Sequence, residues 1–184
     1  MPQEAALRAA LSLFRVPTQA RLLRASSLPN GVTLLLKVAV REDDALAEAE
    51  ALTARQAEDL IDASGFFIEQ VLLHPDADSY RALGVDPESS TGELRTHMAL
   101  LMRWLHPDVA LSPDVDPSRA QLANRVLRAW DDLKTPERRK ALDLRLKAKR
   151  PAIRRAPRIN FRRHRQSRTM MTRLLSFLAR RPHS

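Results

Sequence analysis

Apolar side chains recur every three or four residues through much of the first 146 residues of this chain. The spacing is clear at 57–72, 94–105 and 123–133, where it matches the 3.6-residue turn of an α-helix. Only 4 of the 184 residues are glycine, runs of β-branched residues are nearly absent, and Ala, Leu, Arg and Glu abound. Because strands favour β-branched and aromatic residues, we predict an all-α fold.

The N-terminal element is expected to span 1–31, as an amphipathic helix followed by a linker. Leu7, Leu11 and Phe14 lie on one face of the expected helix. The stretch "ASSLPNG" at 25–31 then supplies Ser, Pro, Asn and Gly, which favour turns.

A helical region is expected at 32–77. The segment 32–40 has enough β-branched residues for a strand, but no partner strand is evident, so a buried helix is favoured. A short helix is expected at 43–52. Thr53 is then predicted to begin a longer helix, with Gln56 three positions later in a capping-box arrangement.

The composition argues against several kinds of chemistry. The chain has no cysteine, which excludes disulfides, thiolate zinc sites and cysteine nucleophiles. No apolar run approaches the roughly 20 residues that span a bilayer, and Glu4 and Arg8 interrupt the apolar N-terminus, unlike a secretion signal. A metal site built from His97, His106 and Asp108 has little support. We expect a cytoplasmic protein that is not an enzyme and uses no metal or cofactor.

The tetrapeptide Leu-His-Pro-Asp occurs twice, at 73–76 and at 105–108. The first copy has a structural explanation, because a proline disfavours the α conformation of the residue before it and so ends a helix at His74. Asp76 and Asp78 then stand where they can cap the next helix. We therefore interpret the first copy as the end of one helix and the cap of another.

The second copy lies between two segments of helical periodicity. Ser90 begins a capping box before the first segment, which ends at His106 because a proline follows. The second segment starts with Asp116 and Pro117, a favourable cap and first-turn residue, and Thr135 repeats this arrangement for a last helix. The core face of the second segment is expected to hold Ala123, Val126, Leu127, Trp130 and Leu133. The pattern predicts two antiparallel helices with His-Pro-Asp at their junction.

These features together make 78–146 resemble the J-domain of DnaJ-like co-chaperones. The stretch "YRALGV" at 80–85 is similar to the first helix of that family, with its Tyr and Leu-Gly-Val. In the family, helix II is followed by a His-Pro-Asp motif. The interval from Glu93 to Asp108 has the same length as the family's interval from the start of helix II to the end of that motif. The stretches "ANRVLRAW" at 123–130 and "LKTPERRKALD" at 133–143 are similar to the end of helix III and to helix IV.

The resemblance implies a helical hairpin with two lesser helices that binds a DnaK-type heat-shock chaperone and stimulates its ATPase. By this resemblance His106, Pro107 and Asp108 dock near the partner's interdomain linker, and Asp108 pairs with a partner arginine. Arg95 and Arg103 add positive charge to helix II. The implied core of the domain consists of Tyr80, Leu83, Leu94, Met98, Leu101, Leu105, Val126, Trp130 and Leu133.

Helix II departs from the family in its charge, which weakens the electrostatic part of docking. The positions that are usually basic hold Arg95, Thr96, Ala99, Leu100 and Trp104, and Met98 replaces the usual tyrosine. Exposed side chains of Leu100 and Trp104 would form an apolar patch that promotes association with other molecules. We therefore expect the helices within 32–73 to pack over this flank and to form one body with the J-like domain.

A basic tail occupies 147–184. Residues 144–184 contain 14 of the 31 basic residues and no acidic one, a net charge of +14, whereas residues 1–143 hold 17 basic and 22 acidic residues, a net charge of −5. Such a tail can be a solubilising extension, bind nucleic acid through its charge, attach peripherally to an anionic membrane through a short amphipathic helix, or dock on a protein. The candidate contacts are Arg154, Arg155, Arg162, Arg163, Arg165, Leu174, Phe177 and Leu178.

Two functions from different classes remain open. The chain is a co-chaperone that recruits or activates a DnaK-type partner, or it is a structural adaptor that keeps the J-like fold as a scaffold and is tethered by its basic tail. The client protein is not specified by the sequence.

Overall fold

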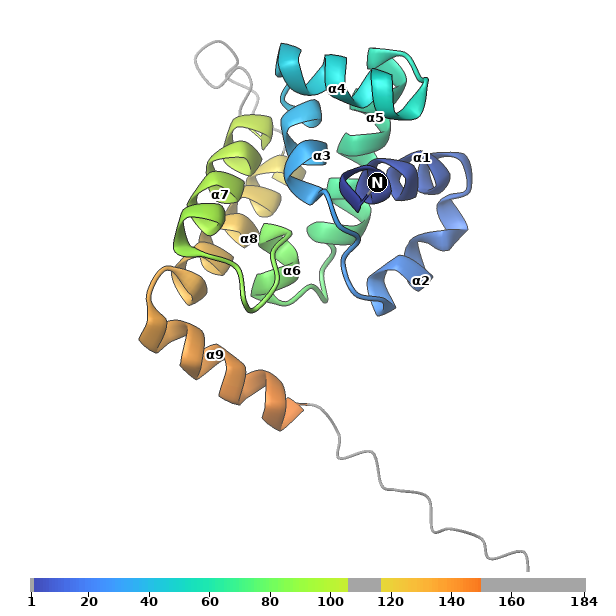
Figure 1. Cartoon of the computed structure of the whole chain (residues 1–184). Coiled ribbons are helices and arrows are strands. Elements are labelled where there is room, and N and C mark those ends of the chain that lie inside the picture. Colours follow the sequence, from blue (N-terminus) through green and yellow to red (C-terminus); the bar gives the residue numbers. More distant parts are fainter. Residues whose placement is uncertain (1, 106–116, 150–184) are drawn as a thin grey trace, which may run out of the picture. The chain divides into compact units, whose positions relative to one another are not determined.

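A computed structural model describes residues 2–105 and 117–149 of the chain (Figure 1). The described residues form helices and no strand, which confirms the all-α prediction. Single turns of 3-10 helix occupy Pro2–Glu4 and Pro17–Gln19, and a π-helical turn occupies Ile68–Leu72. The α-helices are α1 (Ala5–Arg15), α2 (Ala20–Ala25), α3 (Val32–Ala39), α4 (Asp43–Thr53), α5 (Ala57–Phe67), α6 (Ser79–Leu83), α7 (Thr91–Leu105), α8 (Pro117–Leu133) and α9 (Pro136–Lys149).

The predicted buried face of helix α1 is right for Leu7 and wrong for Leu11 and Phe14. Its buried side chains are those of Ala6, Leu7, Ala10 and Leu13. Leu11 is only half-buried, and Phe14 is 46% exposed with its ring edge against Phe66, the two centroids 5.7 Å apart. The small side chains of Ala6 and Ala10 suit the packing of α1 against α5, and Phe14 lies outside this buried face.

The predicted helix start at Thr53 is wrong. Thr53 is the last residue of α4, and its hydroxyl donates to the carbonyl oxygen of Ala49 at 2.7 Å. Because that hydroxyl is satisfied within α4, it does not cap the next helix, and Ala54 leaves α4 in the left-handed conformation with φ of 52°. Helix α5 instead begins after Gln56.

The first Leu-His-Pro-Asp copy lies between two helices, as predicted. Helix α5 continues past Gly65 into the π-helical turn, which ends before His74. The carboxylate of Asp78 accepts a hydrogen bond of 2.9 Å from the backbone N–H of Arg81 and caps α6. Asp76 is not the cap, and its own N–H donates to Nδ1 of His74 at 3.1 Å.

Helices α7 and α8 pack against each other and run in opposite directions (Figure 1). At one end, Arg119 in the first turn of α8 donates to the carbonyl oxygen of Leu105, the last residue of α7, at 3.4 Å. At the other end, Arg139 of α9 donates to the carbonyl oxygen of Ser89, just before α7, at 3.0 Å. The predicted antiparallel order of these two helices is therefore present.

Local capping signals fix where the later helices begin. The hydroxyl oxygen of Ser90 accepts a hydrogen bond from the Glu93 N–H at 3.1 Å, at the start of α7. The Thr135 hydroxyl accepts one from the Arg138 N–H at 3.4 Å, at the start of α9. The cap predicted at Asp116 lies outside the described residues.

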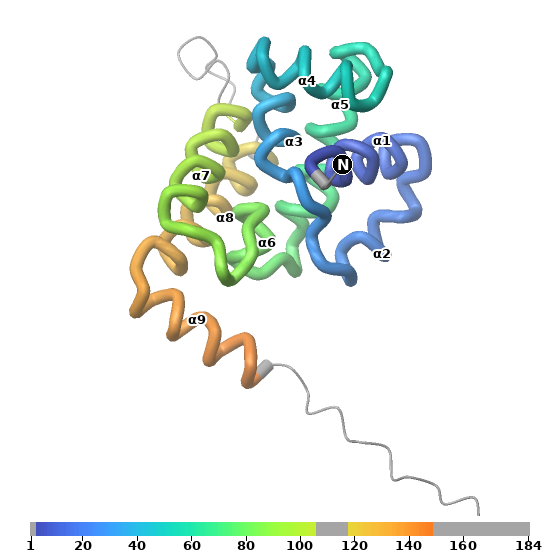
Figure 2. Tube along the Cα trace, in the orientation of Figure 1, coloured from blue at the N-terminus to red at the C-terminus, as the bar shows by residue number. Residues whose placement is uncertain are grey.

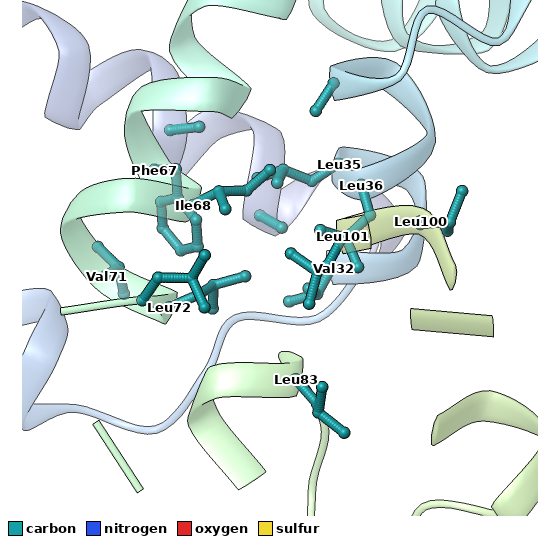
Figure 3. Close-up of a cluster of buried hydrophobic side chains, with 14 of the residues drawn as sticks. Val32, Leu35, Leu36, Phe67, Ile68, Val71, Leu72, Leu83, Leu100 and Leu101 are labelled. Atoms are coloured by element: carbon teal, nitrogen blue, oxygen red, sulfur yellow. The ribbon is translucent and has the colours of Figure 1, made fainter. Parts of the chain in front are cut away.

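One hydrophobic core joins the N-terminal helices to α6, α7 and α8. Figure 3 shows side chains of α3, α5, the π-helical turn, α6 and α7 converging in it, and Figure 2 follows the chain through these elements. The chain up to Lys149 accordingly forms one compact unit by its internal contacts. The labelled core residues are Val32, Leu35, Leu36, Phe67, Ile68, Val71, Leu72, Leu83, Leu100 and Leu101.

The side chains expected in the core of 78–146 differ in how deeply they are buried. Met98 and Trp130 are only half-buried, although both pack against the core. Leu127 is 45% exposed, so its predicted core position is wrong, because α8 turns Val126 and Ala129 inward instead. The buried members of the expected set are Tyr80, Leu83, Leu94, Leu101, Leu105, Val126 and Leu133.

We expect Gly84→Ala to lower the free energy of unfolding. Gly84 has φ of +67°, and a Cβ atom there would lie 2.7 Å from Cγ1 of Val32. The left-handed conformation alone costs a non-glycine residue about 1–2 kcal/mol, and the contact with Val32 adds to this. Chemical denaturation followed by circular dichroism measures the change.

The matched control is Gly92→Ala, in the first turn of α7. Gly92 is exposed, and the nearest atom to its added Cβ is Ser90 Oγ at 3.7 Å. Alanine favours the helix there by about 0.5–1 kcal/mol. Equal effects of the two substitutions would contradict this account of Gly84.

Candidate functional site

The candidate site is the connection between α7 and α8, with the helix ends on either side. His106, Pro107 and Asp108 belong to 106–116 and lie outside the described residues. The tail contacts predicted within 150–184 lie outside them as well. The geometry of the site is therefore built from its flanking helices.

The helix ends on either side of the connection are joined by Arg119. Its Nη1 donates to the carbonyl oxygen of Leu105, and its guanidinium stands over the Trp104 ring, 5.7 Å from the centroid. Leu105 itself is 3% exposed. The carbonyl contact satisfies one of the carbonyl groups left free at a helix C-terminus, and the stacking on Trp104 adds a cation–π attraction. The end of α7 and the first turn of α8 therefore lie close together.

Helix α7 is buried along two flanks. Leu94, Leu101 and Leu105 are buried in the core that α7 shares with α8. On the adjoining flank, Leu100 is 6% exposed, and a Cβ added at Gly65 of α5 would lie 3.6 Å from the Trp104 ring. The hypothesis that the N-terminal helices cover this flank is confirmed for Leu100, whereas Trp104 is half-buried, with Gly65 of α5 on one side and Arg119 of α8 over its ring.

His97 connects three segments at the centre of this packing. Its ring is 1% exposed, with Nδ1 2.9 Å from the carbonyl oxygen of Leu83 and Nε2 2.7 Å from the hydroxyl of Thr33. Because a carbonyl can only accept, Nδ1 carries the proton, and Nε2 of the neutral ring accepts from Thr33. Burial lowers the pKa of His97, although the hydrogen bond to Leu83 and the charge of Glu93 oppose the shift.

Tyr80 and Ser79 attach α6 to the end of the helical hairpin. The Tyr80 hydroxyl donates to a carboxylate oxygen of Asp143 in α9 at 2.8 Å, and the Ser79 hydroxyl donates to Asp132 in α8 at 2.7 Å. Burial and the hydrogen bond to Asp143 both raise the pKa of Tyr80. The tyrosine of the "YRALGV" stretch therefore has a structural role between α6 and α9.

The exposed surface of α7 has little positive charge to offer a partner. Arg95 is exposed beside Thr96 and Ala99. The guanidinium of Arg103, by contrast, forms an ion pair of 2.9 Å with Glu42, just before α4. The two arginines predicted to contact the chaperone thus differ, because Arg103 is already partly neutralised within the chain.

Several long-range contacts of arginine were not foreseen from the sequence. Arg81 of α6 donates to the backbone carbonyl oxygens of Leu23 and Ser26, which fastens the segment after α2. Arg24 of α2 donates to the carbonyl oxygen of Gln70 at 2.6 Å and to its side-chain oxygen at 3.0 Å. Sequence periodicity contains no signal for such contacts, because they depend on how distant helices meet.

Both ring nitrogens of His97 are engaged, which leaves neither for a metal ion. In the part of the chain that the structure describes, no group of three or more His, Cys, Asp or Glu side chains is arranged to hold one. Among the described helices, none combines the length and apolar character that crossing a bilayer requires.

Comparisons of this chain with models of known protein families, with curated proteins and with solved structures gave no match.

We expect the free energy of unfolding to fall as the pH is lowered below about 6.5, the ordinary pKa of histidine. The unfolded chain binds the proton first, because the pKa of His97 is lowered in the fold. The stabilisation that comes from neutral His97 is therefore present above about pH 6.5 and is lost as the pH falls toward the pKa of His97 in the folded chain. Denaturation between pH 5 and 8 should show a shallower pH dependence in His97→Gln. The dependence should not vanish, because the pKa of His74 is also lowered. Identical slopes in the two proteins would contradict a neutral, buried His97.

Proposed function

We propose that this chain is a co-chaperone that binds a DnaK-type heat-shock chaperone and stimulates its ATPase. The J-like part, 78–146, makes the contact, and His106, Pro107 and Asp108 are its centre. In this proposal the chain itself catalyses nothing and needs no cofactor.

The observation that supports the proposal best is the position of the second Leu-His-Pro-Asp in an antiparallel helix pair. Leu105 is the last residue of α7, so the His-Pro-Asp tripeptide begins where α7 ends, at the corner that Arg119 joins. Proline restricts the backbone, and a carboxylate held at such a corner can make a charge-assisted contact with a partner arginine. A contact of this kind biases the partner between two conformations.

The surroundings of α6 add support. Tyr80, Leu83 and Val85 are buried, and Gly84 ends α6 in the left-handed conformation that glycine adopts readily. Burial of Leu83 and Val85 and the left-handed conformation of Gly84 therefore explain why these residue types occur in the Leu-Gly-Val stretch. The same stretch contributes to the resemblance with the J-domain family.

We expect Asp108→Asn to abolish stimulation of the ATPase of a DnaK-type chaperone. The substitution keeps the size of the side chain and removes only the charge that would pair with the partner's arginine. Single-turnover ATP hydrolysis, measured with and without the full chain, gives the comparison.

Asp76→Asn is the matched control, because Asp76 occupies the same place in the first Leu-His-Pro-Asp copy. Asp76 is exposed, and its N–H rather than its carboxylate bonds to His74. Its variant should stimulate as well as the wild type. Equal hydrolysis rates with and without the wild-type chain would contradict the co-chaperone function.

The ion pair between Arg103 and Glu42 favours a second candidate, a structural adaptor. In this alternative the J-like fold is a scaffold that no longer activates the chaperone, since α7 offers little free positive charge. The basic tail at 147–184 tethers the protein to an anionic membrane surface or to nucleic acid.

We expect deletion of 150–184 to abolish co-sedimentation with either anionic vesicles or DNA, because these residues hold most of the excess positive charge. Membrane attachment through apolar residues should persist at high salt, whereas binding to DNA should weaken steeply with added salt. Undiminished binding of the truncated chain to both would show that the tail is not the tether.

A further inference from the structure

A cleft of about 310 Å3 lies between the N-terminal region and the first half of α8. Its walls come from α2, the π-helical turn, the segment after that turn, and α8. Leu122, which is half-buried, contributes apolar surface. The polar and charged residues that matter for its chemistry are Arg24, Glu69, His74, Arg119, Gln121 and Arg125.

The guanidinium groups of the cleft are held in place by backbone carbonyls. Arg24 donates to the carbonyl oxygen of Gln70, Arg125 to that of Leu73, and Arg119 to that of Leu105. A guanidinium has five N–H donors in a rigid plane, so each retains donors beyond these contacts. Pre-positioned guanidiniums favour carboxylates, which they can bind through two parallel hydrogen bonds.

The charge around the cleft is positive. Its described lining residues include three arginines but only one carboxylate, that of Glu69. Burial and then the charge of Arg24 lower the pKa of His74, the charge of Asp76 opposes the shift, and Arg81 and Arg125 add to it. The Asp76 N–H donates to Nδ1 of His74, so the neutral ring has its proton on Nε2 and adds one more donor.

We propose that this cleft binds an acidic peptide segment of a protein partner. A peptide fits better than a nucleic acid, because the described lining residues offer no Phe, Tyr or Trp side chain for base stacking. The apolar surface of half-buried Leu122 suits the methylene groups of Asp and Glu side chains rather than a bare phosphate.

The cleft also lies beside the corner proposed to dock the chaperone. Arg119 both lines the cleft and bonds to Leu105, the residue before His106. In an extension that rests on the proposed function, the acidic segment belongs to the DnaK-type chaperone. The cleft then supplies the positive charge that α7 lacks, from α2 and α8 instead.

The test uses the full chain, so that the basic tail is the same in every variant. A fluorescein-labelled peptide of alternating Glu and Ala is titrated by fluorescence anisotropy. Gln121→Glu places a carboxylate in the cleft with little change of shape, and Arg119→Gln removes one cation. Asn124→Asp and Arg128→Gln make the same charge changes on exposed positions of α8 that do not line the cleft.

We expect each cleft variant to weaken peptide binding about five-fold, the effect of one charge contact in high dielectric. The α8 controls should stay within two-fold of the wild type. Equal affinities for all four variants would overturn the proposal. Circular dichroism shows whether Arg119→Gln is folded, and Gln121→Glu, at an exposed position, tests the site without removing a contact.

The assignment of the chaperone as partner has its own measurement. The concentration of chain that half-maximally stimulates the ATPase should rise about five-fold in Gln121→Glu, with the maximal rate retained, because this substitution leaves the contact of Arg119 with Leu105 in place. Selective loss of peptide binding without that rise would overturn the chaperone as partner. Absence of any stimulation by the wild type would instead count against the proposed function, while the peptide titration would still decide the cleft.

Discussion

Helix α7 is buried on two flanks, and this double burial determines how the other described helices are arranged. One flank packs in the core shared with α8, whereas Leu100 and Trp104 on the other meet the N-terminal helices. His97 stands between the two flanks and joins α7 to Thr33 of α3 and to the end of α6. Because these contacts come from both sides, the N-terminal region and the described residues of 78–146 share one core.

This packing limits which surfaces α7 and α8 could present in the proposed function. The flank of α7 that holds Trp104 is covered, and Arg103 is paired with Glu42. Positive charge is instead concentrated around the cleft that α2 and α8 both line, at Arg24 and Arg125. A partner that engages the end of α7 would therefore approach from the side of α8, and the N-terminal region would take part in recognition.

The sequence predicted several features that depend on neighbours in the chain, although the capping box at Thr53 was wrong because its hydroxyl bonds back to Ala49 within α4. The caps at Asp78 and Ser90 were recognisable because a capping side chain bonds to a backbone N–H three residues later. The buried face of α1 was not, because Ala6 and Ala10 gain their importance only from the approach of α5. The bond of His97 to Thr33 was equally hidden, since it joins residues 64 positions apart that meet only in the folded chain.

Photo-crosslinking at the α7–α8 connection tests the central claim most directly. A photoreactive benzoyl-phenylalanine replaces Val109, next to the second tripeptide, and in a separate variant Glu48, on the exposed surface of α4. The account predicts that the chain labelled at 109 crosslinks to an ATP-bound DnaK-type chaperone and that the chain labelled at 48 does not. Equal crosslinking from both positions, or crosslinking from position 48 alone, would contradict it.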